Sequence, residues 1–184
     1  MSRGGDQSAR HRAVPMLMLD LFAGLGGASA AMRARGWRVV TVDIEPRFGC
    51  DVTADLLTWT WDGPTPDLLW ASPPCTEFSR EDMPWCRTGV APSLSLVERV
   101  DQLVAQIRPR WWVLENVRGA QRWIGRARLH YGPVYLWGDF PMMPQLDVRP
   151  WKTRLSSTQD ALRAKIPWAI SEALADAIEG LVPA

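Results

Sequence analysis

An apolar run of strand length leads directly into three glycines in the stretch Val14–Gly27, VPMLMLDLFAGLGG. The run is too uniformly apolar for a strand with one face in water, so we expect a central parallel strand covered on both faces. The glycines permit a tight turn and let a ligand lie against the backbone with no Cβ in the way. The stretch therefore predicts the first strand and the ligand-binding turn of an α/β fold.

The segments after the glycines complete a strand, turn, helix and strand unit. Residues 28–35 (ASAAMRAR) favour a helix that ends at Gly36, and a second strand is expected over Trp37–Val42. Asp43 follows, about 20 residues after the first glycine, which is the spacing at which a carboxylate meets ribose hydroxyls in nucleoside-binding folds. The glycines do not match GxGxxG and no Walker lysine is present, so a small adenosine-bearing cofactor is favoured.

A second apolar run, Asp67–Ala71, stops at Ser72-Pro73-Pro74 and is followed by Cys75. Prolines fix φ and remove backbone donors, so the strand must end there and Cys75 lies at its carboxyl end. A lone cysteine is most often a small buried hydrophobe. Ligands of open α/β sheets bind at the carboxyl ends of the strands, and this position favours a nucleophile instead.

The run Arg110–Val117 (RWWVLENV) places a carboxylate and an amide, Glu115 and Asn116, at the end of another strand. Sequential strands usually pair, so this strand end is expected beside the one that carries Cys75. Taken alone, Glu115 would be interpreted as an acidic residue that is exposed to solvent at the end of a strand. Beside a cysteine that needs an acid partner, a catalytic role is favoured.

The remaining segments predict one loop and two helices. Thr76–Pro92 has mixed charges and no clear period, as is typical of a long active-site lid. Ser93–Ile107 and Arg163–Ile178 have apolar residues at helical spacing. Residues 1–13 are expected to be a disordered leader, and residues 14–184 a single catalytic domain.

Composition excludes several classes of protein. With 47% apolar and 22% charged residues in a chain of 184, the protein reads as an ordinary globular domain. No apolar run approaches the roughly 20 residues that span a bilayer, so no membrane association and a cytoplasmic location are expected. Cys50, Cys75 and Cys86 lack CxxC or Cys/His spacing, which argues against disulfides and predicts no metal site.

Positive charge is concentrated in one part of the chain. Residues 105–154 contain nine Lys or Arg and three acids, a charge of +6, which leaves −5 for the rest of a chain whose formal charge is +1. Seven Trp and Tyr residues lie in the same segment. This pattern indicates a polyanion-binding face with aromatic rings that stack on bases. The alternative is that the aromatic residues belong to the core and the arginines to a solvated face.

Four motifs together resemble those of the cytosine carbon-5 DNA methyltransferases, in that family's order. They are Asp20–Gly27 (DLFAGLGG), Asp43–Pro46 (DIEP), Ser72–Cys75 (SPPC) and Glu115–Val117 (ENV). The resemblance covers roughly the first two thirds of the chain. It implies a Rossmann-like, S-adenosylmethionine-dependent methyltransferase fold of class α/β, with a mostly parallel sheet and helices on both faces.

The same resemblance implies S-adenosylmethionine as cofactor and S-adenosylhomocysteine as product. It assigns Asp43 to the ribose and Asp51 to the adenine, although Asp51 also reads as an ordinary turn residue. The expected cofactor-binding residues are Asp20, Phe22, Ala23, Gly24, Gly26, Gly27, Asp43, Ile44, Glu45, Asp51, Val52 and Pro73.

Cytosine chemistry fits the residues at the two strand ends. Carbon 5 is a poor nucleophile, so a thiolate must first add to carbon 6, and Cys75 would supply it. Glu115, kept protonated by burial, would hydrogen-bond the ring nitrogen N3. A base stacked in duplex DNA must be flipped out, or be single-stranded already. Asn116 and Arg128 complete the expected catalytic set.

The chain departs from the family pattern after Val117. The usual Tyr-Gly-Val-Pro-Gln-x-Arg-x-Arg segment is missing, and Arg126 or Arg128 is the expected substitute for its base-holding arginine. Leu136–Pro141 resembles a strand-and-turn segment of phage-encoded members. Between Phe140 and Ser156 there is no room for a separate target-recognition domain, so target specificity is expected to be short, relaxed or supplied by a protein partner.

The expected function is therefore DNA cytosine-5 methylation by a compact, phage-like enzyme. The alternatives are methylation of RNA or of a free cytosine nucleotide, transfer of an altered sulfonium group, and a non-catalytic cofactor-binding subunit that assists a larger enzyme. The target sequence and the oligomeric state do not follow from these motifs.

Overall fold

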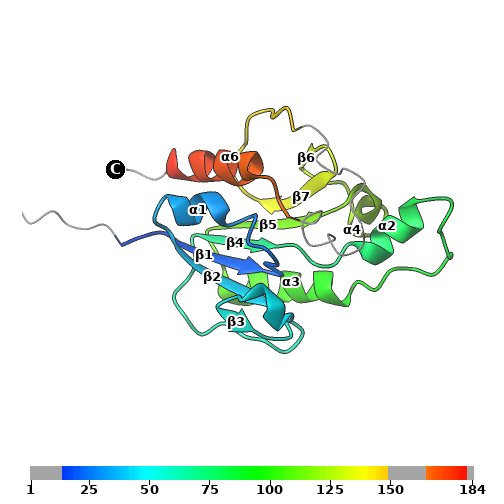
Figure 1. Ribbon diagram of the computed structural model, residues 1–184, viewed down its shortest axis with the longest axis horizontal. Coiled ribbons are helices and arrows are strands. Elements are labelled where there is room, and N and C mark those ends of the chain that lie inside the picture. The colour runs from blue at the N-terminus through cyan, green and yellow to red at the C-terminus, as the bar shows by residue number, and fades with distance from the viewer. Residues whose placement is uncertain (1–13, 149–164, 182–184) are drawn as a thin grey trace, which may run out of the picture.

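The computed structural model describes residues 14–148 and 165–181 (Figure 1). The expected leader, residues 1–13, lies outside the described residues. The strands are β1 (Leu17–Leu21), β2 (Arg38–Asp43), β3 (Val52–Thr53), β4 (Leu68–Ala71), β5 (Trp111–Asn116), β6 (Leu129–Tyr131) and β7 (Val134–Asp139). The helices are α1 (Ala30–Ala34), α2 (Thr76–Asp82), α3 (Ser95–Ile107), α4 (Gln121–Ile124) and α6 (Trp168–Glu179), with short 3₁₀ turns at Pro46–Phe48 and Arg118–Ala120.

These strands form one sheet in the order β3-β2-β1-β4-β5-β7-β6. The five strands from β3 to β5 are parallel to one another, and β7 runs antiparallel to both of its neighbours. Ala71 at the end of β4 is in register with Leu21 of β1 and with Leu114 of β5. The ends of the central strands therefore lie side by side, and the topology confirms the expected Rossmann-like, mostly parallel sheet.

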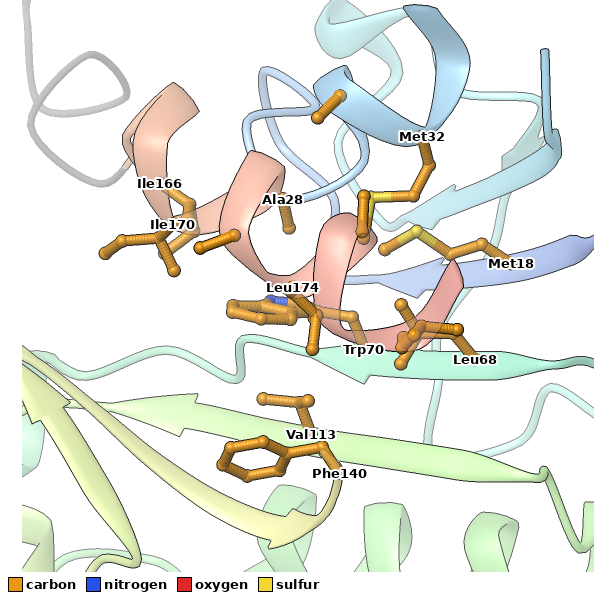
Figure 2. Close-up of a cluster of buried hydrophobic side chains, with 14 of the residues drawn as sticks. Met18, Ala28, Met32, Leu68, Trp70, Val113, Phe140, Ile166, Ile170 and Leu174 are labelled. Carbon is orange, nitrogen blue, oxygen red and sulfur yellow. The ribbon is translucent and has the colours of Figure 1, made fainter. Parts of the chain in front are cut away.

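Helices cover both faces of the sheet, as expected. On one face, α1 and α6 enclose a core in which Ile170 and Leu174 of α6 lie near Trp70 of β4 (Figure 2). On the other face, α3 packs its buried side against the sheet through residues such as Val100 and Leu103. Every residue of β1 and β4 is buried, which is why their sequences, apart from Asp20, are apolar rather than alternating.

The prediction of a continuous loop over Thr76–Pro92 is wrong for its first part, because α2 occupies Thr76–Asp82. The helix is only seven residues long, and Phe78 is its one buried apolar residue. A helix of this length does not repeat an apolar position, so its sequence shows no period. Glu81 is also buried, and the irregular chain after Asp82 continues to α3.

No helix in the described part of the chain combines the length and the apolar content needed to cross a bilayer.

Candidate active site

A cavity of about 420 Å³ opens at the carboxyl ends of β1, β2, β4 and β5, and we call it the Cys75 cavity. Its volume is typical of small-molecule sites. It brings together eleven of the residues predicted from the sequence: Asp20, Phe22, Ala23, Gly24, Gly27, Asp43, Ile44, Glu45, Pro73, Cys75 and Glu115. Five others lie outside its lining: Gly26, Asp51, Val52, Asn116 and Arg128.

The glycine turn forms one wall of the Cys75 cavity. Phe22, Gly24 and Gly26 all have positive φ angles, of 57°, 51° and 64°. Glycine adopts this conformation without strain, whereas Phe22 must be held in it by its surroundings. No atom lies within 4 Å of the position that a Cβ on Gly24 would take. A ligand can therefore lie directly against the backbone there.

Asp43 holds the glycine turn in place. Its Oδ2 accepts a hydrogen bond from the Gly24 N–H at 2.9 Å, and its Oδ1 accepts one from the Glu45 N–H at 2.9 Å. Asp43 is buried, and Glu45, two residues later, is exposed at the mouth of the same cavity. The carboxylate that the sequence assigned to a ribose, Asp43, and the expected cofactor-binding residue Glu45 therefore both line this cavity.

Asp20 lies at the end of β1, buried beneath the turn. The Ser29 hydroxyl donates to its Oδ2 at 2.6 Å. Burial penalises the charged carboxylate and raises the pKa of Asp20 from 3.8 to about 7, although the Ser29 hydrogen bond acts in the opposite direction. The residue lines the cavity without being exposed to bulk water.

Asp51, the residue expected at the adenine, binds the protein's own backbone. Its Oδ2 accepts from the Thr41 N–H at 2.8 Å and from the Thr41 hydroxyl at 2.6 Å, and it pairs with Arg33 at 3.2 Å. Burial acts to raise the pKa of Asp51, but the Thr41 hydrogen bonds outweigh it and the pKa is lowered. These contacts connect the residue that precedes β3 to β2. They agree with the alternative interpretation of Asp51 as a structural turn residue.

The cavity contains a single cysteine although the chain has three, all of them among the described residues. Cys75 follows β4 and immediately precedes α2. Cys50 donates to the Gly24 carbonyl at 3.9 Å, and burial raises the pKa of its thiol, which disfavours the thiolate. Cys86 is exposed away from the cavity. Cys75 is thus the nucleophile candidate.

Glu115 comes to the same cavity from the neighbouring strand, β5. The parallel pairing of Ala71 with Leu114 places the two strand ends together, as the sequence predicted. A thiol and a carboxyl group that are distant in sequence therefore face one space. This is the arrangement required for adding a nucleophile to a ring while protonating it.

Asn116 is buried beside the cavity and holds the loop that carries Cys75. Its Nδ2 donates to the Pro73 carbonyl at 3.0 Å, and its Oδ1 accepts from the Val117 N–H at 2.9 Å. Both ends of the amide are used within the protein. Asn116 therefore connects β5 to the loop that carries Cys75, and its place in the catalytic set stays a prediction.

Arg128 does not reach the Cys75 cavity. Its Nη1 donates to the Gly138 carbonyl at 3.3 Å and to Asp139 at 3.4 Å, and its guanidinium lies 4.9 Å from the centre of the Phe140 ring. These contacts hold it on the outer strands, β6 and β7. Arg128 is not among the residues that line the cavity, and its role as the arginine that holds the target base stays a prediction.

Several lining residues were not identified from the sequence. Pro133 lies in the β6–β7 turn and Val134 begins β7, and no motif there predicted a ligand contact. Lys165 and Ile166 immediately precede α6, where a helix that closes the pocket was expected. A Cβ on Gly27 would lie 2.6 Å from the Ile166 carbonyl oxygen, so the third glycine allows this segment to close against the turn.

The residues of the Cys75 cavity fit an adenosine-bearing sulfonium cofactor. The open backbone at Gly24 offers a surface for the ligand, Ile44 and Phe48 supply apolar contacts, and the carboxylates of Asp43 and Glu45 match hydroxyl and cationic groups.

Comparison with known proteins agrees with this geometry. The family model for C-5 cytosine-specific DNA methylase matches residues 16–123. A curated protein of Frog virus 3 (isolate Goorha), named "Probable DNA (cytosine-5)-methyltransferase", is 31% identical over 117 residues, which are 55% of this chain and 53% of the viral protein. The chain thus matches about half the length of this relative.

Solved structures show more distant similarity. The Schizosaccharomyces pombe Dnmt2 methyltransferase is 20% identical, with a TM-score of 0.42 over 58% of this chain and 38% of that one. The Pyrococcus abyssi tRNA (uracil-54, C5)-methyltransferase, solved with S-adenosyl-L-homocysteine, is 18% identical, with a TM-score of 0.39 over 67% of this chain and 33% of that one.

Proposed function

Since this chain belongs to the C-5 cytosine-specific DNA methylase family, we propose that it methylates carbon 5 of cytosine in DNA, with S-adenosylmethionine as the methyl donor. The observation that carries the proposal is the shared cavity. Cys75, Glu115 and the open backbone at Gly24 all face one space of about 420 Å³. A thiolate, an acid and a cofactor-binding turn are the three parts that the reaction requires.

Cys75 acts first in the proposed reaction. Its thiolate adds to carbon 6 of the cytosine, forming a C–S bond, while Glu115 delivers a proton to N3 and so accepts the charge that develops on the ring. The electron pair of the broken 5,6 double bond then makes carbon 5 nucleophilic. The bound cofactor supplies the methyl group as a sulfonium substituent. A base finally removes the carbon-5 proton, which re-forms the 5,6 double bond and expels the Cys75 thiolate, while the N3 proton returns to Glu115.

Asn116 contributes by fixing the geometry of attack. Because its side chain binds the Pro73 carbonyl, the Ser72–Cys75 loop is tied to β5, the strand that carries Glu115. The distance between nucleophile and acid is therefore set by the sheet rather than by a flexible loop. Asp43 fixes the cofactor-binding turn in a comparable way.

DNA recognition is proposed to require little of this chain, or to be supplied by a protein partner. A buried cytosine in a duplex must be extruded before Cys75 can reach it, unless the substrate is single-stranded. We propose that the enzyme works in the cytoplasm of a bacterial or phage-infected cell, where its nucleic-acid substrate is found.

The test is methyl transfer from labelled S-adenosylmethionine to duplex DNA, followed by mass analysis of the nucleosides. Wild type should yield 5-methylcytosine. Cys75→Ser should bind the cofactor with unchanged affinity but yield no product, and Glu115→Gln should lower the rate by roughly 10²–10⁴-fold. Retained transfer by Cys75→Ser would contradict the mechanism.

The same assay separates the alternatives. RNA and free cytidine nucleotides, offered side by side with DNA, show whether another substrate is preferred. A product mass other than that of methylcytosine reveals a different transferred group. Cofactor binding without transfer to any substrate would indicate the non-catalytic subunit.

A further inference from the structure

A second hollow, of about 540 Å³, lies on the outer strands of the sheet, and we call it the Arg126 pocket. Its chemistry differs from that of the Cys75 cavity. The residues that give it its character are two arginines, two glutamines and an aromatic pair: Arg126, Arg128, Gln121, Gln145, His130 and Tyr135. Cationic, amide and aromatic groups in one hollow are the set that recognises a nucleotide.

The aromatic pair is built by the β6–β7 hairpin. His130 and Tyr135 are directly opposite each other in the register, and their rings stack at 4.8 Å with an interplanar angle of 12°. Trp137 lies two residues further along β7, with its ring centre 6.5 Å from that of Tyr135. His130 is exposed. The hairpin therefore offers a flat aromatic surface to which an unstacked base can be added.

The arginines are presented by a turn that the protein holds in place. The Ala127 N–H donates to the Gln121 Oε1 at 3.1 Å, and the Trp137 Nε1 donates to the Gly125 carbonyl at 2.9 Å. Arg128 is oriented by its contacts with Gly138, Asp139 and Phe140. Arg126 is exposed, and no hydrogen bond or ion pair of its side chain is seen within residues 14–148 and 165–181. Its charge is thus available to an anion.

The Arg126 pocket is structurally continuous with the catalytic loop. Tyr135 pairs with Asn116 in the sheet, and Asn116 binds the Pro73 carbonyl, two residues before Cys75. The turn of the same hairpin, at Pro133 and Val134, lines the Cys75 cavity. A strand of nucleic acid whose target base enters the cavity can therefore continue across the hairpin.

We infer that the Arg126 pocket binds a nucleotide neighbouring the target in the same nucleic-acid strand. Arg126 contacts its phosphate, and the base stacks on the His130–Tyr135 pair. This inference rests on the proposed function for the identity of the strand. Stacking and phosphate contacts hold any sequence. The pocket therefore supplies affinity without target selection, as a chain with relaxed specificity requires.

The test measures binding of a fluorescent single-stranded deoxyoligonucleotide containing cytosine, and of its duplex, over a series of salt concentrations. Arg126→Ala should weaken binding of the single strand and reduce the slope of log K against log salt by about 0.7, the contribution of one phosphate contact. His130→Ala should weaken binding roughly 5- to 100-fold. In the methylation assay both variants should raise the KM for DNA, and His130→Ala should leave kcat at saturating DNA unchanged.

Arg38→Ala is the matched control, because Arg38 is an exposed arginine at the opposite, amino-terminal end of β2. It removes the same charge and should bind like wild type. Unchanged cofactor affinity in all variants verifies that they are folded. Wild-type affinity and salt slope in Arg126→Ala and His130→Ala would overturn the inference, and so would an equal loss in Arg38→Ala.

The outcome is independent of the catalytic proposal. A wild-type protein that transfers no methyl group, but loses oligonucleotide binding on Arg126→Ala, would retain this pocket and refute the proposed function. A protein that methylates DNA with an unchanged KM in Arg126→Ala and His130→Ala would support the proposed function and refute this inference.

Discussion

At the scale of single residues, Asp20 is an ionisable side chain in a buried position, and burial opposes its ionisation. Its carboxyl group is buried under the glycine turn and accepts a hydrogen bond from Ser29. Burial raises its pKa to about 7, so the folded protein retains a proton that the unfolded chain releases at much lower pH. The stability of the fold is therefore linked to the ionisation of this residue.

We expect Asp20 to destabilise the fold as pH rises. The unfolded carboxyl is ionised above its ordinary pKa of 3.8, whereas the folded one ionises only near 7. Between about pH 5 and pH 8, wild type should lose roughly 2–3 kcal/mol relative to Asp20→Asn, in which the amide oxygen still accepts from Ser29. Urea unfolding of both proteins at the two pH values measures this difference. Parallel pH dependence in the two proteins would show that Asp20 ionises normally.

At the scale of elements, the chain after α2 is held by one carboxylate. Glu81 accepts from the Thr88 N–H at 3.0 Å, from the Thr88 hydroxyl at 2.8 Å and from the Gly89 N–H at 3.2 Å, and it pairs with Arg80 at 3.1 Å. The backbone and hydroxyl hydrogen bonds of Thr88, above all, lower the pKa of Glu81 to about 2. The contribution of these bonds is present at neutral pH and is lost only as pH falls from about 4.5 towards 2.

Glu81→Gln should loosen the segment that follows the nucleophile's helix. A glutamine has one acceptor oxygen and no charge, so it cannot keep all of these hydrogen bonds. We expect the amides of Thr88 and Gly89 to exchange with deuterium roughly tenfold faster at neutral pH. Glu98→Gln is the control, since Glu98 is exposed on α3. Unchanged exchange in Glu81→Gln would mean that other contacts order this segment.

The elements that were predicted correctly carry a strong local signal. Apart from Asp20, β1 and β4 are apolar because both faces are covered, and α3 repeats its apolar positions over thirteen residues. The sequence of α2 shows no repeated apolar position, because Phe78 is the one buried apolar side chain among its seven residues. The β6–β7 hairpin determines where Arg128 lies, and that depends on pairing with β5 rather than on nearby sequence.

The candidate site was predictable for a related reason. The glycine turn and Cys75 follow the buried strands β1 and β4, and Glu115 lies near the end of β5, so a parallel sheet must gather them at one edge. Asp51 lies equally close to a strand, but its carboxylate is used by Thr41 and Arg33. Partners of this kind depend on tertiary contacts that the spacing of motifs does not encode.

At the scale of the whole molecule, the Cys75 cavity is lined by residues that lie far apart in the sequence, from Asp20 to Ile166. Lys165 and Ile166 line the cavity beside the glycine turn. Ser171 of α6 strengthens this joint, donating to the Ala28 carbonyl at 2.6 Å and accepting from the Ala31 N–H at 3.1 Å. Cofactor binding should therefore depend on the packing of α6 against α1.

Gly27→Ala tests this joint. The new Cβ would lie 2.6 Å from the carbonyl oxygen and 2.7 Å from the nitrogen of Ile166, so backbone must move. We expect a loss of roughly 1–3 kcal/mol in the free energy of unfolding, together with weaker binding of S-adenosylmethionine by calorimetry. Gly36→Ala is the control: its Cβ meets open space, and only the strain of a positive φ is added. Equal cofactor affinity in both variants would exclude a role for the joint in binding.

The contact between Gly27 and Ile166 also affects the order of events during synthesis. The ribosome makes the turn, the nucleophile and the acid well before it makes α6. A nascent chain therefore contains Cys75, Glu115 and the glycine turn before it contains Lys165 and Ile166, which complete the lining of the Cys75 cavity. We therefore expect methyl transfer only after α6 has left the exit tunnel and packed against α1.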